Sequence, residues 1–187
     1  MIGSQSKAFP TLTIGNFYVY GSHHEETIPQ DKISFKIDAA TAFGTGQHAT
    51  TQGCLLALEK LKKEGYAPLN PLDLGCGTGI LGMAIARLFT VNGTMSDNDI
   101  EAVEKATSNV LENDLKSQIT CYLSEGFQSE ILKNEAPYDL VTANILADPL
   151  IQLASDMNQY VSKDGIVILS GLLATQAEAV GKAYESF

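Results

Sequence analysis

The sequence predicts an α/β protein with a doubly wound, mostly parallel sheet, and three observations support this class. Apolar runs of strand length alternate with helix-length segments along most of the chain, a pattern typical of parallel βαβ units. A glycine-rich turn, Asp73–Gly79, separates a short apolar run from an apolar stretch of helical length. Asp97 lies 22 positions beyond Gly75, at the end of the next expected strand. In such sheets, ligands bind at the carboxyl ends of the strands.

Three elements are expected before the glycine-rich turn. Lys32–Asp38 alternates between apolar and polar residues, which predicts a half-buried strand. Leu12–Tyr20 is a weaker strand candidate, because a Gly-Asn pair interrupts it. His48–Glu64 carries leucines at helical spacing and lysines in its last turn, so a helix is expected there.

Strands and helices are expected to alternate after the turn. Two helix starts carry explicit signals: Asp148 and Pro149 fit an N-cap and first helical position, and Thr175 with Glu178 fits a capping box. The expected strands are Val91–Ser96, Gln118–Leu123, Tyr138–Ala143 and Ile166–Ser170, and the expected helices are Ile80–Phe89, Asp99–Leu111, Pro149–Tyr160 and Thr175–Tyr184.

The spacing of the glycines indicates the class of ligand. Gly75, Gly77 and Gly79 form G-x-G-x-G, whereas a dinucleotide site has G-x-G-x-x-G. The turn has no Lys or Arg to neutralise a phosphate, and Asp73 adds a negative charge. S-adenosyl-L-methionine has no phosphate and carries a positive sulfonium and ammonium, so it is the favoured cofactor. Asp97 is expected to hydrogen-bond the ribose of this cofactor. The pairing of the glycine turn with Asp97 disfavours the alternative, in which the glycines form only a tight bend.

Residues that follow two other strands are further candidates for the same site. Glu125, Gly126 or Phe127 is expected to flank the adenine, because these residues follow the strand after Asp97. Asn144 also ends a strand, where an asparagine is usually a turn residue. Its side-chain carbonyl, facing a sulfonium methyl, would orient an incoming amine, which makes Asn144 the catalytic candidate.

The segment Phe43–Thr51 is rich in glycine and hydroxyl groups and leads into a helix. One interpretation is a mobile lid that orders over the cofactor, with Phe43, Thr45 and Thr51 in contact with it. The alternative is an ordinary helix N-cap region. The residues alone do not separate these two interpretations.

Composition narrows the possible partners and compartments. The 187 residues suffice for one domain, and 12 basic against 22 acidic residues leave a net charge of −10. Such a chain is a poor partner for nucleic acid and a better one for basic proteins or cationic ligands. Three cysteines without metal-site spacing fit a reducing compartment, and no metal is expected. We find neither a signal peptide nor an apolar run of the ~20 residues that a membrane helix needs, so a soluble, cytoplasmic protein is expected.

Three segments carry a resemblance to a known family over Phe9–Phe187. They are Phe43–Thr51, the run Ala143–Ala147 followed by Pro149 and Leu150, and the run Leu169–Leu173 followed by Gln176–Glu178. The chain resembles the S-adenosylmethionine-dependent methyltransferases of ribosomal protein L11, whose glycine turn is common to class I methyltransferases.

The resemblance implies transfer of methyl groups to lysine or other amino groups of ribosomal protein L11, with S-adenosyl-L-homocysteine as product. It implies cofactor contacts at Thr51, Gly75, Asp97 and Asn144. It also implies that residues 1–38 are an N-terminal β extension and linker remnant, before a methyltransferase domain over residues 39–187. A recognition domain that normally precedes this core and a C-terminal antiparallel hairpin are expected to be missing. The strand Ile166–Ser170 would then be an edge strand.

Three rival functions are weighed against this one. A methyltransferase of nucleic acid or of a small molecule would share the fold, but Asn144–Ala147 lacks the proline and aromatic residue that stack a flipped base. A nicotinamide dehydrogenase is disfavoured by the glycine spacing. A fragment that binds the cofactor without activity is the third alternative.

Overall fold

A five-stranded sheet forms the centre of the computed structural model, which describes residues 11–37 and 47–185. Its strand order is β6-β5-β4-β7-β8, and all four neighbouring pairs are parallel. This confirms the doubly wound α/β class, with a sheet that is wholly parallel in the described residues. The strands are β4 (Pro71–Leu74), β5 (Gly93–Asp97), β6 (Ile119–Leu123), β7 (Tyr138–Asn144) and β8 (Val161–Ser170).

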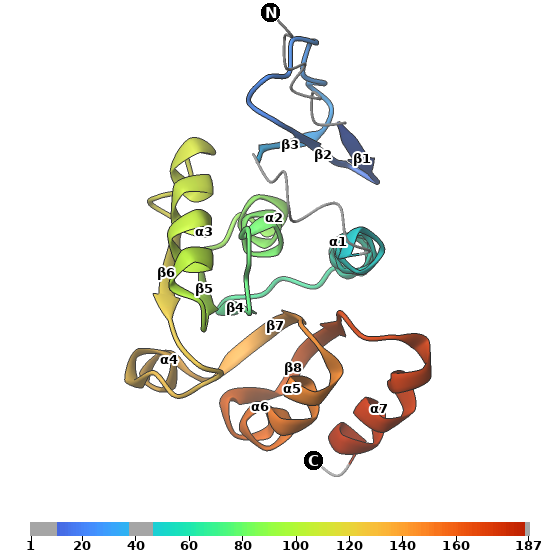
Figure 1. Cartoon of the computed structure of the whole chain (residues 1–187), viewed down its shortest axis with the longest axis vertical. Coiled ribbons are helices and arrows are strands. Elements are labelled where there is room, and N and C mark those ends of the chain that lie inside the picture. Colours follow the sequence, from blue (N-terminus) through green and yellow to red (C-terminus); the bar gives the residue numbers. More distant parts are fainter. Residues whose placement is uncertain (1–10, 38–46, 186–187) are drawn as a thin grey trace, which may run out of the picture.

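Helices cover both faces of this sheet (Figure 1). One face carries α1 (Gln47–Lys63), α2 (Ile80–Phe89) and α3 (Ile100–Glu112). The opposite face carries α4 (Glu130–Glu135), α5 (Ala147–Gln152), α6 (Ala154–Tyr160), the 3₁₀ turn η1 (Ala174–Gln176) and α7 (Ala177–Glu185). The chain crosses from one half of the sheet to the other between β6 and β7, so β4 and β7 meet at the switch point.

A small second sheet lies over α1 and α2 (Figure 1). It contains β1 (Leu12–Ile14), β2 (Phe17–Tyr20) and β3 (Ile33–Lys36), with β1 antiparallel and β3 parallel to β2. The Gly-Asn pair that weakened the strand prediction forms the turn between β1 and β2. The alternation predicted for β3 is confirmed, because Phe35 and Ile37 are fully buried.

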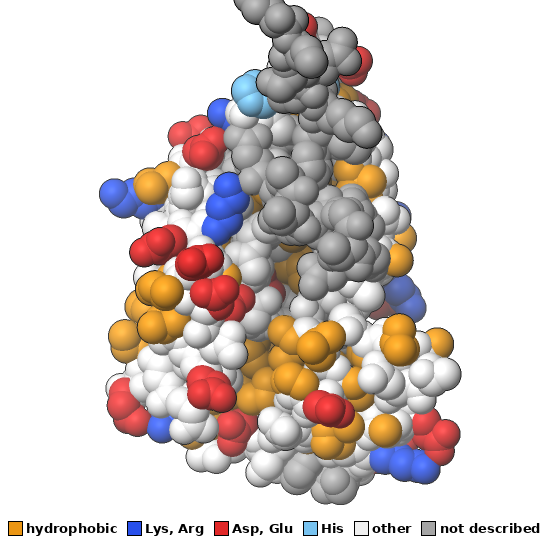
Figure 2. Space-filling view, in the orientation of Figure 1, with side chains coloured by type: hydrophobic (Ala, Val, Ile, Leu, Met, Phe, Trp, Pro, Cys, Tyr) orange, Lys and Arg blue, Asp and Glu red, His pale blue; other side chains and the backbone are white. Residues whose placement is uncertain are grey.

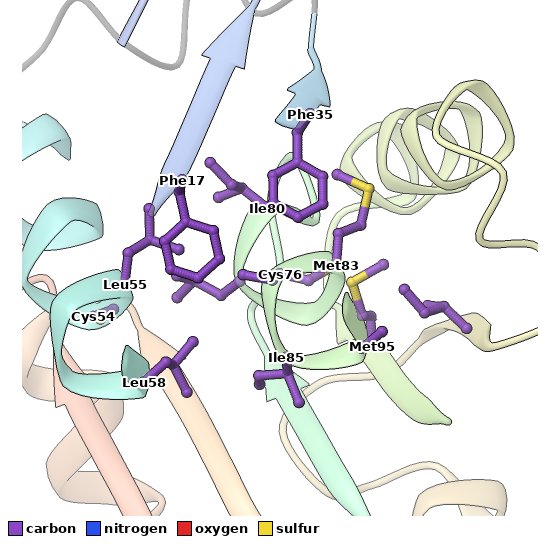
Figure 3. Packing of buried hydrophobic residues seen from close by; sticks show 14 of the residues in the cluster. Phe17, Phe35, Cys54, Leu55, Leu58, Cys76, Ile80, Met83, Ile85 and Met95 are labelled. Atoms are coloured by element: carbon purple, nitrogen blue, oxygen red, sulfur yellow. The ribbon is translucent and has the colours of Figure 1, made fainter. Parts of the chain in front are cut away.

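The main core lies between the small sheet and the first face of the large one. Phe17 and Phe35 stack with their ring centroids 6.3 Å apart. They pack with residues of α2 such as Met83 and with Met95 of β5 (Figure 3). A second buried cluster fills the opposite face, where Tyr138 is its largest fully buried side chain.

The prediction of one continuous helix over Pro149–Tyr160 is wrong. The helical segment begins at Ala147 and divides at Leu153 into α5 and α6. Leu146 is extended and occupies the N-cap, so Asp148 lies in the first turn and is not the cap. The division places Leu153 directly against Gly126, where an added Cβ would lie 2.6 Å from Leu153 Cδ2.

The last helical segment also begins earlier than its sequence signal indicated. The capping box of Thr175 and Glu178 is wrong, because Thr175 lies inside η1. The cap is two residues earlier, at Leu173, whose backbone N–H donates to Gln176 Oε1 at 2.8 Å. Helix α4 was not predicted, although Ser129 caps it by accepting a hydrogen bond from the Ile131 N–H at 3.2 Å. Strand β8 is an edge strand among the described residues, as expected, and pairs with β7.

Candidate active site

A cavity of about 1120 Å³ opens at the carboxyl ends of β4, β5, β7 and β8. This volume suits a ligand of nucleoside size or larger. Its walls come from the glycine-rich turn, the first residues of α1 and the segments after β6, β7 and β8. The sequence-predicted residues that line it are Thr51, Gly75, Gly77, Asp97, Glu125, Gly126 and Asn144.

The three glycines of the turn have two different structural roles. Gly75 and Gly77 line the cavity and have φ angles of +71° and +53°, a region that favours glycine. Gly77 exposes backbone to the cavity, because no atom lies within 4 Å of a Cβ built there, whereas a Cβ at Gly75 would lie 2.4 Å from Ile145 Cγ2. Gly79 is outside the cavity lining and is the N-cap of α2 at φ +82°. A Cβ there would lie 3.0 Å from Met95 Cε and 3.3 Å from Ala106 Cβ, so helix packing explains this third glycine.

Asp97, the last residue of β5, is oriented by two backbone donors. The Gly77 N–H donates to Oδ2 at 2.9 Å, and the Asp99 N–H donates to Oδ1 at 3.0 Å. A carboxylate oxygen accepts about two hydrogen bonds, so each oxygen retains capacity for a ligand. The carboxylate is half-buried in the cavity wall and is therefore held ready for a diol.

Asp73 is a structural carboxylate rather than a free charge beside the turn. It is buried on β4, where Thr142 Oγ1 donates to Oδ1 at 2.8 Å and the Gly82 N–H donates to Oδ2 at 2.9 Å. It thereby connects β4 to β7 and to α2. Burial raises the pKa of Asp73 from 3.8 to about 6; the two hydrogen bonds oppose this rise, and the charge of Asp97 adds to it.

This shift predicts a pH-dependent stability. The folded chain holds the Asp73 proton more tightly than the unfolded chain, so Asp73 stabilises the fold below pH ~4 and loses that contribution as pH rises through ~6. We expect the free energy of unfolding of the parent, minus that of Asp73→Asn, to fall by about 2 kcal/mol between pH 4 and pH 7. Urea unfolding of both proteins across this range measures the difference. A constant difference would contradict the assignment.

Asn144 and Thr51 meet across the cavity wall. Asn144 Nδ2 donates to Thr51 Oγ1 at 3.2 Å, which joins the end of β7 to the first turn of α1. Asn144 Oδ1 is buried and has no hydrogen-bond partner among the described residues. Buried acceptors normally have partners, so this oxygen marks a position where a ligand donor is wanted.

The residues expected on the adenine side differ in their position relative to the cavity. Glu125 and Gly126 line the cavity, but Phe127 is fully buried. Its ring lies 5.1 Å from that of Tyr160 and 6.2 Å from that of Tyr138. The prediction that Phe127 flanks a ligand is therefore wrong, because tertiary packing turns this ring into the core. Phe43 and Thr45 lie outside the described residues.

The cavity is acidic and combines polar with apolar walls. Four carboxylate residues line it, and the described lining contains no Lys, Arg or His. Sequence reasoning missed Asp156 of α6, which belongs to no motif. It also assigned no role in the site to the apolar residues that follow β7 and β8, although they belong to segments that carry the family resemblance. Within residues 11–37 and 47–185, no cluster of three or more His, Cys, Asp or Glu could hold a metal ion.

Comparison with known proteins places this chain in a family. Residues 3–187 match the family described as Ribosomal protein L11 methyltransferase (PrmA). The chain belongs to this L11 methyltransferase family. A ribosomal protein L11 methyltransferase of Brucella suis is 42% identical over 172 residues, which cover 92% of this chain and 60% of that protein. One of Rhodopseudomonas palustris is 41% identical and covers 92% of this chain and 58% of that protein.

A solved L11 methylase supports the fold of this L11 methyltransferase family member. The protein from Lactobacillus delbrueckii subsp. bulgaricus superposes with a TM-score of 0.83 at 24% identity. The match covers 95% of this chain and 88% of that one. The present chain spans about three fifths of the length of the curated L11 methyltransferases that it matches. No helix in the described part of the chain is long and apolar enough to cross a membrane.

Proposed function

We propose that this chain is the catalytic core of an S-adenosyl-L-methionine-dependent methyltransferase that modifies lysine and other amino groups of ribosomal protein L11. The unpartnered Asn144 Oδ1 in the wall of an acidic cavity carries this proposal, because it offers an acceptor to an amine N–H. Family membership supports the choice of substrate. The acidic net charge fits a basic protein partner better than nucleic acid.

The residues of the cavity fit the proposed cofactor. Gly75 and Gly77 present backbone without side chains to its methionyl part, and the oriented Asp97 carboxylate suits the ribose hydroxyls. Glu125 and Gly126 line the same cavity and would flank the adenine. The carboxylates of the wall favour a ligand with a positive sulfonium and ammonium, and the absence of basic side chains from the described lining disfavours phosphates.

The proposed mechanism assigns positioning to the protein. S-adenosyl-L-methionine supplies an electrophilic methyl group, so a new C–N bond forms while the C–S bond breaks and its electron pair stays on sulfur. Asn144 Oδ1 would accept an N–H of the amine and orient its lone pair. Thr51 would hold the Asn144 amide through its 3.2 Å hydrogen bond. A lysine amine has an ordinary pKa of about 10.4, so it must lose a proton before it attacks. No general base is assigned, and water would take the proton.

The test combines Asn144→Ala with Asn144→Asp. Because alignment by one well-placed polar group is commonly worth about 10²–10³ in turnover, Asn144→Ala should lower methyl transfer to ribosomal protein L11 by about this factor. Affinity for S-adenosyl-L-homocysteine should fall much less, since Asp97 and the glycine turn are unchanged. Transfer of labelled methyl groups and calorimetry provide the two measurements, and Asn144→Asp, which keeps an acceptor oxygen, should retain more turnover than Asn144→Ala.

Two outcomes would overturn the proposal. One is a parent chain that binds the cofactor and methylates nucleic acid or a small molecule in preference to ribosomal protein L11. The other is an Asn144→Ala variant with the turnover of the parent. The proposed compartment is the cytoplasm, where all three cysteines, which are free in the structure, would remain reduced.

A further inference from the structure

Two leucines stand at the edge of the cavity with most of their surface in solvent. Leu146 is 70% exposed and Leu173 is 68% exposed, and both belong to the cavity lining. Among the large apolar side chains that the structure describes, Leu69 alone is more exposed, at 84%. Figure 2 shows hydrophobic side chains gathered over this part of the molecule, beside α5 and α7. Single exposed leucines are common on protein surfaces, but two at one cavity opening form an apolar patch of the kind that marks binding sites.

The backbone holds these leucines in fixed positions. Leu146 is the N-cap of α5, and Leu173 is the N-cap of η1. The loops that carry them are bonded to each other, because the Ile145 N–H donates to the Ser170 carbonyl oxygen at 3.1 Å. Gly171 approaches the Ile145 backbone so closely that a Cβ there would lie 2.4 Å from the Ile145 oxygen. The two loops that carry the leucines are therefore joined directly through their backbones.

The cavity behind them has the opposite character. Its wall contains Asp97, Glu125 and Asp156 as well as the buried Asp73, and the described lining offers no positive side chain. An apolar edge over an acidic interior is complementary to a molecule with an apolar stem and a positive tip. Lysine has this form, with four methylene groups and a terminal ammonium.

We propose that Leu146 and Leu173 form the entrance for the acceptor and enclose the methylene stem of a lysine side chain, while Asn144 meets its nitrogen. This inference rests on the proposed function and adds a choice among amines: the entrance favours the long, unbranched side chain of lysine in an extended protein segment over shorter amines. Contact with two leucines also removes water from the stem and the nitrogen. Desolvation disfavours the charged ammonium and so opposes the stabilisation of that form by the carboxylates of the cavity.

The first test measures binding without catalysis. The chain is saturated with S-adenosyl-L-homocysteine, its leucine methyl groups are isotope-labelled, and n-butylammonium and ethylammonium are titrated in as mimics of long and short amines. We expect the Leu146 and Leu173 methyl resonances to shift with n-butylammonium and much less with ethylammonium. The double variant Leu146→Ser/Leu173→Ser should bind n-butylammonium about tenfold more weakly, the effect of roughly two buried methylene groups.

Leu69→Ser is the matched control, because Leu69 is also a highly exposed leucine but is outside the cavity lining. It should bind n-butylammonium like the parent. The proposed entrance is contradicted if the parent binds S-adenosyl-L-homocysteine but its Leu146 and Leu173 methyl resonances do not shift with n-butylammonium. A parent that shows the shifts but transfers no methyl group to lysine overturns the proposed function alone.

The second test measures selection among substrates. Peptides with lysine or 2,3-diaminopropionic acid at one position are compared as methyl acceptors. The parent should prefer the lysine peptide, and the double variant should lose most of that preference through a higher KM for lysine. Leu69→Ser should keep the preference, and a double variant that keeps it as well would contradict the inference.

Discussion

Asp97→Ala is expected to raise the dissociation constant for S-adenosyl-L-methionine at least tenfold. The carboxylate is already oriented by the backbone N–H groups of Gly77 and Asp99, and it would accept two charge-assisted hydrogen bonds from the ribose. Each such bond contributes about 1.5–3 kcal/mol, so the loss of one suffices for a tenfold effect. Calorimetric titration of S-adenosyl-L-methionine and S-adenosyl-L-homocysteine measures the change.

Asp99→Ala is the control for a local loss of stability. Asp99 caps α3 by accepting a hydrogen bond from the Glu101 N–H at 2.9 Å, and it is outside the cavity lining. Its removal should cost about 1 kcal/mol of unfolding free energy and leave cofactor affinity near that of the parent. If Asp97→Ala binds the cofactor as tightly as the parent does, the ribose assignment is wrong.

Gly171→Ala is expected to produce the largest loss of stability among the substitutions considered. Gly171 has a φ of +85°, where an L side chain costs about 1–2 kcal/mol. The new Cβ would also lie within 2.8 Å of three backbone atoms of Ile145, and relief of that overlap costs about 1–3 kcal/mol more. We expect a loss of about 3 kcal/mol in urea unfolding, together with weaker cofactor binding, because the ends of β7 and β8 must separate.

Gly181→Ala provides the contrasting glycine. Gly181 lies within α7, its φ is not in the left-handed region, and no atom lies within 4 Å of a Cβ built there. Alanine should therefore stabilise the chain by about 0.5–1 kcal/mol. Equal unfolding free energies for the two variants would show that the junction of β7 and β8 tolerates a side chain.

Local sequence was sufficient for the parts of the site that depend on strand ends. Asp97 and Asn144 are the last residues of β5 and β7, and the glycine turn joins β4 to α2. Parallel strands bring such ends to one edge, so their shared cavity followed from topology alone. The alternation of β3 was equally informative, because a period of two identifies the buried face.

Features decided by distant packing could not be predicted in this way. Phe127 follows a strand end, as Glu125 does, but its ring is drawn into the core by Tyr138 and Tyr160. The exposure of Leu146 and Leu173 at the cavity was likewise not predicted, because nothing in their apolar sequence neighbourhood distinguishes them from core residues. The capping errors at Asp148 and Thr175 have a related cause: several adjacent residues could start each helix, and the connection from the preceding strand selects one.

The cavity lining begins at Thr50 and ends at Leu173, and this span has a consequence for chain synthesis. During translation the segment from β4 to β6 emerges before β7 and β8, with one side of β4 unpaired until β7 is made. The opposite cavity wall, which includes Gly171 and Leu172, emerges later still. A ligand that touches both walls can stabilise only chains that have reached this length. Such a ligand therefore acts on folding only after the two halves of the sheet have joined.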